Sequence, residues 1–335
     1  MANDVLQILK DSTPRVQIPN DFAIRRYYRT KRYLEDLTDE AVLQRGRDLF
    51  MNLMTIGQNG KLSPIPLEFN AHWYFRKRFN EFIEECEIRH GNYPNGFEQF
   101  TEGLRIPRPD SAVVTWAVHD AEKRGLVPGT FIAKYGRNEH LNSAFRSGRL
   151  RIAPASNYLG NAHNPAVRDD ELSFTFYVHD PTSEDFEPYA EFASEPMKEH
   201  FRGSIEITET TREDYYVFCL SAAYEPRLFA DFEADACLLI REPKVFLSRL
   251  MQTTKDALGA RGWSFQPVTY VDPMTEKGSG TPIVFRKNFR YSYQQEWRAA
   301  WLPSRPALQL DAQFVEIGAL DDIADLIVFD PNSTA

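Results

Sequence analysis

The spacing of apolar residues changes near residue 127, and the change predicts two kinds of structure. Before that point, apolar residues recur every three or four positions, which is typical of amphipathic helices. This interval predicts helices over 38–54, about 70–89 and 110–124. Thr38 is a suitable N-cap for the first helix, because acidic residues follow it in the first turn. The sequence therefore predicts a mainly helical N-terminal domain over residues 1–126.

After residue 127 the pattern changes to short β-rich runs separated by turn residues. These runs lie at 131–135, 149–154, 172–180, 215–223, 236–240, 266–272, 282–287, 296–302 and 325–329. Helical spacing returns only at 139–147 and 243–258. The pattern predicts an α+β domain over 127–335, with a mixed, mostly antiparallel sheet and flanking helices. Nucleotide-binding doubly wound folds are disfavoured, because no strand leads into GxGxxG or GxxxxGK[ST].

Composition narrows the class of protein and the partners that it can have. The 335 residues are 42% hydrophobic and include 24 Phe and 15 Tyr, which excludes wholesale disorder. No apolar run approaches the roughly 18 residues that span a bilayer, and no signal peptide is evident, so we expect a cytoplasmic protein without a membrane partner. The net charge of −9 gives no overall attraction to nucleic acid. Any binding of nucleic acid would therefore be local.

The three cysteines favour neither a disulfide framework nor a zinc site. Cys86, Cys219 and Cys237 are an odd number at wide spacings, and no CxxC pair is present. We therefore expect a reducing compartment and no bound metal.

Residues 25–33 interleave five basic residues with three aromatic ones. This composition can clamp phosphates and stack on unpaired bases, which makes Arg25, Arg26 and Arg29 candidate nucleic-acid-binding residues. The alternative interpretation is a helix whose aromatic residues pack inward while its cations stay solvated.

An acidic run at residues 168–171 offers a candidate metal site. Hard cations take several carboxylate oxygens, so Asp169, Asp170 and Glu171 could serve a metal-dependent nuclease. No second carboxylate segment or suitably spaced histidine accompanies them, which favours a solvated turn instead.

The strongest chemical pattern lies at residues 294–298. Strand alternation would send Gln294, Glu296 and Arg298 to one face, an unusual set for a hydrophobic core. The alternative is a surface strand in which Arg298 pairs with Glu296 or a neighbour. Polar and aromatic residues also stand at strand ends upstream, namely Lys134, Tyr135, Ser156, Tyr158 and Ser221.

In this order the motifs resemble a widespread, uncharacterised bacterial domain that is often met in abortive-infection and phage-defence contexts. The resemblance covers about residues 130–300. The matching residues are Lys134, Tyr135, Gly148, Leu150, Ser156, Asn164, Pro165, Ser221, Lys287, Tyr293, Glu296, Trp297 and Arg298.

More distantly, the same order is similar to ADP-ribosyltransferases. The resemblance implies NAD as a substrate, Glu296 as the catalytic carboxylate that stabilises an oxocarbenium-like centre, and Gln294 as the residue that orients the acceptor. It implies that Tyr135 or Tyr158 stacks on nicotinamide and that Ser156 or Ser221 braces the pocket. Lys134 or Arg137 would stand where a first-strand His or Arg is expected. Arg298 would complete the cofactor-binding set.

Two functions follow as expectations. The first is an intracellular bacterial effector that transfers ADP-ribose from NAD to a macromolecule in phage defence or a toxin system. The second is a non-catalytic sensor of a defence system that binds nucleic acid or a protein.

Overall fold

The computed structural model describes residues 21–56, 62–65, 70–91, 97–104, 111–159, 170–179, 204–275, 280–305, 307 and 309–330. These residues fall into two compact units. The first is drawn from Met1–Thr55, Leu62–Ile106 and Val178–Ile205, and the second from Ile56–Lys61, Pro107–Tyr177 and Glu206–Ala335.

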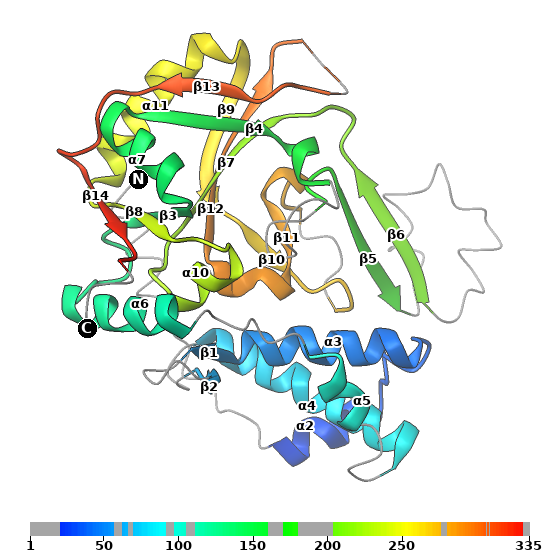
Figure 1. Ribbon diagram of the computed structural model, residues 1–335. Coiled ribbons are helices and arrows are strands. Elements are labelled where there is room, and N and C mark those ends of the chain that lie inside the picture. The colour runs from blue at the N-terminus through cyan, green and yellow to red at the C-terminus, as the bar shows by residue number, and fades with distance from the viewer. Residues whose placement is uncertain are drawn as a thin grey trace. The chain divides into compact units, whose positions relative to one another are not determined.

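The first unit is mainly helical, as the apolar spacing predicts. It contains α2 (Asp21–Tyr28), α3 (Asp39–Asn52), α4 (Asn70–His90) and α5 (Phe97–Glu102), with the short strands β1 (Met54–Ile56) and β2 (Leu62–Pro64) (Figure 1). Thr38 caps α3, since its hydroxyl accepts a hydrogen bond from the backbone N–H of Ala41 at 3.3 Å. The N-cap prediction is confirmed.

Aromatic packing joins α3, α4 and α5. The ring of Phe82 is fully buried on α4 and lies near Phe79 and Phe100, with centroids 5.5 and 5.4 Å away. Gly46 makes this packing possible, because a Cβ at that position would lie 2.3 Å from the Phe82 ring. The two longest helices of this unit are therefore in close contact.

The second unit is an α+β structure, as predicted. Its helices are α6 (Ser111–Arg124), α7 (Asn138–Ser147), α10 (Pro226–Asp231) and α11 (Pro243–Ala257), with the 3-10 turns η1 (Ala155–Leu159), η3 (Ile283–Phe285) and η4 (Phe289–Gln294). Its strands are β3 (Ile132–Gly136), β4 (Arg149–Pro154), β5 (Ser173–His179), β6 (Ser204–Thr210), β7 (Tyr216–Ser221), β8 (Ala236–Ile240), β9 (Ala260–Pro267), β10 (Thr269–Val271), β11 (Arg286–Asn288), β12 (Glu296–Pro303), β13 (Gln313–Glu316) and β14 (Ala324–Val328).

One strand, β7, organises the large antiparallel sheet. The order is β13-β4-β7-β3-β8-β14, and β12 pairs with both β7 and β9. One edge of β7 pairs along its length with β12, whereas the other edge pairs first with β4 at Val217 and then with β3 at Ser221. The sheet therefore divides into two branches where β4 and β3 separate. Outside it, β5 pairs with β6 and β10 pairs in parallel with β11.

Helices cover the two faces of the sheet unequally. On one face, Phe218 and Trp301 join a core that includes residues of α7 and α11. On the opposite face, β3 and β8 pack against α6 and α10. Beside them, the same face of β7 and β12 is covered by η1 and η3, through Ala155 and Phe285. Polar residues gather on this last part of the sheet.

We expect Gly148→Ala to destabilise the second unit more than Gly259→Ala. Both glycines have positive φ, at 68° and 53°, so either alanine costs about 1–2 kcal/mol of backbone strain. Only at Gly148 would the new Cβ meet neighbouring atoms, 2.0 Å from the carbonyl oxygen of Gly318, which adds roughly 1–3 kcal/mol. Urea unfolding of the two variants measures the difference. Equal midpoints of the two variants would contradict the close approach of Gly148 to Gly318.

Candidate functional site

Glu296 and Arg298 lie on the same face of β12, as the alternation predicts. Their partners on β7 are Ser221 and Cys219, so all four residues share this face. The strand begins at Glu296, whereas Gln294 ends η4 and Gln295 has a left-handed φ of 44°. Strand alternation therefore does not apply to Gln294. The expectation of a surface strand is also wrong, because Glu296 and Arg298 are 5% and 0% exposed.

Arg298 is the centre of a buried network of charges. Its Nε donates to Glu296 Oε1 at 2.8 Å, and its Nη2 donates to Glu171 Oε1 at 2.9 Å. Its Nη1 donates to the backbone oxygen of Val284 at 2.8 Å and also forms an ion pair with Glu171. The guanidinium thus joins β12 to η3 and to the segment just before β5. The predicted pairing of Arg298 with Glu296 is confirmed.

The second oxygen of Glu296 accepts from a lysine. Lys287 Nζ on β11 lies 2.8 Å from Glu296 Oε2 and 3.2 Å from the side-chain oxygen of Gln294. Tyr270 is the register partner of Lys287 on β10, and its hydroxyl accepts from the backbone N–H of Glu296 at 2.7 Å. The β10–β11 pair therefore holds both the backbone and the carboxylate of Glu296. Gln294 joins the site through the lysine.

The network keeps Glu296 ionised. Burial alone would raise the pKa of this carboxyl, but the charges of Arg298 and Lys287 outweigh burial and hold the pKa well below its usual range. Within this buried group, the carboxylates of Glu171 and Glu296 form ion pairs with two cations, Arg298 and Lys287. Such balanced clusters occur at active sites and in purely structural ion pairs.

Lys134 lies where the two branches of the sheet separate. Its Nζ donates to the backbone oxygen of Cys219 at 2.8 Å and lies 4.9 Å from the centre of the Phe218 ring. Burial lowers the pKa of Lys134, and the negative charge of Glu296 offsets only part of this effect. The lysine is therefore an electrostatic neighbour of the candidate carboxylate.

Tyr158 and Cys219 lie on the same side of the sheet as Glu296. Both are partly buried and pack against the cluster formed by η1, η3, β7 and β12. Burial raises the pKa of Tyr158, with smaller contributions from Cys219 and Glu171. Burial also raises the pKa of the Cys219 thiol to about 12, so the thiol stays protonated at neutral pH.

Three other predicted site residues hold turns together. Ser221 Oγ donates to the backbone oxygen of Gln294 at 2.7 Å, which fixes the turn that precedes β12. Ser156 Oγ donates to Asp214 Oδ2 at 2.6 Å, at the start of η1. Tyr135 points to the opposite face from Lys134, where its hydroxyl donates to the backbone oxygen of Ala223 at 2.9 Å. The hydroxyls of Ser156 and Tyr135 therefore bind atoms of neighbouring turns.

The acidic run at 168–171 divides in the structure. Asp170 is exposed and accepts hydrogen bonds from the backbone N–H groups of Leu172 and Ser173, both at 3.0 Å, as expected of a turn. Glu171 is buried and pairs with Arg298, so the prediction of a solvated turn is wrong for this residue. Residues 168 and 169 lie outside the described residues. Within the described ranges, no group of three or more His, Cys, Asp or Glu could hold a metal ion.

The basic segment 25–33 faces acidic residues of α4. Arg25 Nη1 lies 3.0 Å from Glu87 Oε1, and Arg29 forms an ion pair with Glu84. Arg26 is exposed. The alternative of solvated cations therefore holds for Arg26 and for Arg29, whose side chain is 63% exposed although it pairs with Glu84, whereas Arg25 is only partly exposed. The structure places two of the three candidate nucleic-acid-binding arginines in ion pairs within their own unit.

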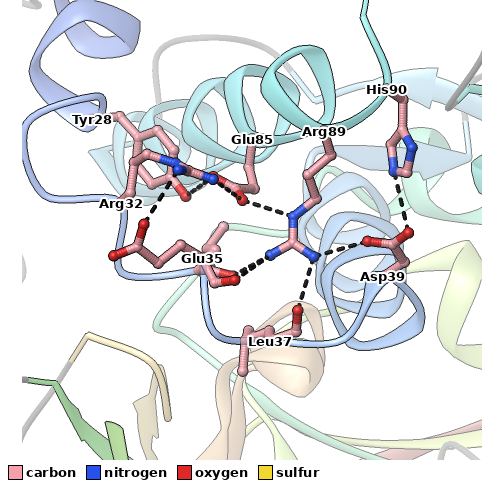
Figure 2. A network of polar contacts seen from close by, with 9 residues as sticks. Tyr28, Arg32, Glu35, Leu37, Asp39, Glu85, Arg89 and His90 are labelled. Carbon is pink, nitrogen blue, oxygen red and sulfur yellow. Dashed lines mark hydrogen bonds and ion pairs between the residues drawn. The ribbon is translucent and has the colours of Figure 1, made fainter. Parts of the chain in front are cut away.

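The buried carboxylate of Glu85 anchors this arrangement (Figure 2). It accepts from the Tyr28 hydroxyl at 2.7 Å, from Arg32 Nη2 at 3.0 Å and from Arg89 Nε at 2.7 Å. Arg89 also donates to Asp39 and to the backbone oxygens of residues 34, 35 and 37. The segment between α2 and α3 is thereby fixed against α4.

Sequence reasoning did not assign Lys287, Glu171, Tyr270 or Cys219 to the site. Lys287 belonged to the residues that carry the family resemblance, and this was the available signal for it. Glu171 was noted only as a candidate metal ligand in the acidic run at 168–171. Tyr270 and Cys219 lack a local pattern that distinguishes them from core residues.

No model of a protein family matches this chain, and no curated protein or solved structure matches it. The resemblances to a phage-defence domain and to ADP-ribosyltransferases remain predictions. Among the helices that the structure describes, none is long and apolar enough to cross a membrane.

We expect the stability difference between the wild type and Lys134→Met to depend on pH in a defined direction. Burial lowers the folded-state pKa of Lys134, so the unfolded chain binds more protons between that pKa and about 10.5. In this range the wild type gains stability as the pH rises, and the methionine variant lacks this gain. Melting temperatures of both proteins from pH 7 to 10 measure the effect. A constant or falling difference would show that burial does not lower the pKa of Lys134.

We expect Arg29→Gln and Arg26→Gln to differ in stability. Loss of Arg29 removes the partner of the buried carboxylate of Glu84; because the arginine itself is 63% exposed, we expect the free energy of unfolding to fall by about 1 kcal/mol. Arg26 is exposed, so its replacement changes the free energy by less than about 0.5 kcal/mol. Urea titration followed by circular dichroism compares them. An equal loss would contradict the assigned pairing.

Proposed function

We propose that the protein is an effector that transfers ADP-ribose from NAD to a macromolecule, in phage defence or a toxin system. The observation that carries the proposal is Glu296, a buried and ionised carboxylate at the first residue of β12. Gln294 and Arg298, which the resemblance to ADP-ribosyltransferases also implies, lie in the same network. The assignment of the effector to phage defence or a toxin system rests on the family resemblance.

The proposed reaction needs an ionised carboxylate. The bond between C1 of the nicotinamide ribose and the nicotinamide nitrogen breaks, and its electron pair leaves with neutral nicotinamide. A nucleophile on the acceptor forms a new bond to C1 and loses its proton. Positive charge develops on the ribose in the transition state, and a fixed carboxylate stabilises that charge. Arg298 and Lys287 hold the pKa of Glu296 low enough for this role.

NAD would have to displace one existing contact. Arg298 is fixed in position by Glu171 and by the backbone of Val284, so its hydrogen bond to Glu296 Oε1 is difficult to displace. Lys287 reaches Oε2 along a flexible side chain, and its bond to Gln294 is longer, at 3.2 Å. We infer that a ribose hydroxyl replaces Lys287 at Oε2. The lysine then remains within reach of Gln294.

A second candidate is a non-catalytic sensor that binds nucleic acid or a protein. The observation that favours it is the saturation of Glu296, since both carboxylate oxygens already accept from cations. Such saturation is typical of a buried structural ion pair. The two candidates differ in whether NAD is consumed.

We expect Glu296→Asp to reduce nicotinamide release from NAD at least about 100-fold per folded molecule. The aspartate keeps the charge but withdraws the carboxylate by one methylene, which removes it from the developing positive charge. The assay uses labelled NAD and a cell extract, and follows nicotinamide release together with transfer of label. Glu296→Gln is a poorer choice, because loss of one charge from a buried pair costs about 3–5 kcal/mol of stability.

The matched control is Glu171→Asp, which shortens the other carboxylate on Arg298. We expect it to lower the melting temperature about as much as Glu296→Asp while it retains nicotinamide release. Equal loss of activity in both variants would contradict a catalytic role for Glu296. Absence of release by the wild type would favour the sensor.

A further inference from the structure

The face of the sheet that carries the candidate site continues onto an uncovered surface. Ala153 on β4 pairs with Val217 on β7, so their side chains share the face of Cys219. Along β4, alternation places Arg149 and Arg151 on this same face, with Leu150 and Ile152 on the core side. Both arginines are exposed, because η1 and η3 cover only the part of this face on β7 and β12.

An exposed aromatic ring stands beside the two arginines. Phe314 on β13 is the register partner of Arg151 and is 57% exposed. The guanidinium carbon of Arg149 lies 4.7 Å from the centre of the Phe314 ring. The three side chains therefore form one guanidinium–aromatic surface, which we call the β4–β13 platform.

The two arginines of the platform differ from many other arginines in this unit. Several others form ion pairs with carboxylates, namely Arg124, Arg227, Arg241, Arg249, Arg261, Arg286 and Arg298. Among the residues that the structure describes, Arg149 and Arg151 form no ion pair. Glu316 is the register partner of Arg149, yet the Arg149 guanidinium lies over Phe314. Their charge is therefore available to a ligand.

The charge of the platform acts on residues of the candidate site. The charge of Arg151 lowers the pKa of both Lys134 and Tyr158, although burial is the larger influence on each. A ligand on the platform thus lies along the sheet face that leads to Glu296.

Exposed guanidinium groups around an exposed ring fit a flexible polyanion with flat bases. Phosphates pair with guanidinium groups, and an unpaired base stacks on an aromatic side chain. A folded acidic protein offers the charge but no base, and duplex DNA keeps its bases stacked within the helix. We propose that the β4–β13 platform binds single-stranded nucleic acid. This binding does not depend on the proposed transfer reaction, and its test needs no NAD.

The test measures fluorescence anisotropy of labelled 20-nucleotide single-stranded DNA and RNA against the full chain at several salt concentrations. For Arg149→Gln/Arg151→Gln we expect weaker binding and a salt slope smaller by about 1.4, because each phosphate contact to a single strand contributes about 0.7. For Phe314→Ala we expect binding about 5- to 150-fold weaker, as for loss of one stacked base. The control Arg241→Gln/Arg249→Gln removes the same charge elsewhere and should leave binding unchanged.

Three outcomes would overturn the proposal. The first is an absence of binding by the wild type at low salt. The second is unchanged affinity in both platform variants, which would direct attention to other cations such as Arg26. The third is equal binding of a duplex or of poly-glutamate of matched length, which would indicate general attraction to polyanions. Unfolding curves of each variant confirm that a loss of binding is not a loss of fold.

Discussion

The second unit depends on one buried guanidinium. Arg298 is fully inaccessible to solvent and binds Glu296 on its own strand, Glu171 before β5 and the backbone of η3. These partners come from three separate parts of the sequence. An arginine in this position is stable only if all its partners are present, because an uncompensated buried charge costs several kcal/mol. The arrangement around Arg298 therefore fixes how these segments meet.

The first unit also has a buried charged group at its centre, but there the group is an acid surrounded by cations. There the central buried group is the carboxylate of Glu85, and the cations reach it from α4 itself and from the segment that follows α2. Burial would raise the pKa of Glu85, but hydrogen bonds from Arg32, Tyr28 and Arg89 hold it below its ordinary value. In both units, a run of charged residues contains side chains that join separate segments, beside others, such as Arg26 and Asp170, that stay exposed.

Local patterns predicted the longer helices α3, α4, α6, α7 and α11 and most strands of the second unit, because the apolar spacing that forms an element lies within that element. The short elements α5, α10, β1 and β2 were not predicted. The α+β class, the cap at Thr38 and the shared face of Glu296 and Arg298 are confirmed for this reason. Strands β6, β9 and β13 were not predicted, and residues 282–287 form η3 and only the start of β11. Their burial depends on partners outside the segment, which a local window does not contain.

The charged site was predictable only in part, for a similar reason. Glu171 and Arg298 are 127 residues apart, so no local pattern shows that each compensates the other. Lys287 reaches Glu296 because β11 pairs with β10, a contact that depends on the complete fold. Gln294 was expected on a strand, yet it reaches the site from a 3-10 turn. The identities of the chemical groups were visible in the sequence, but their environment was not.

The position of β7 has a consequence for how the protein is made. Its partners are β3 and β4, which precede it in the chain, and β12, which begins 75 positions after its register partner Ser221. During synthesis, one whole edge of β7 has no strand to pair with until residues 296–301 of β12 emerge from the ribosome. Folding of this unit therefore waits for distant contacts, which is slow and leaves an open strand edge exposed in the nascent chain. A chaperone that shields strand edges would find its substrate in that interval.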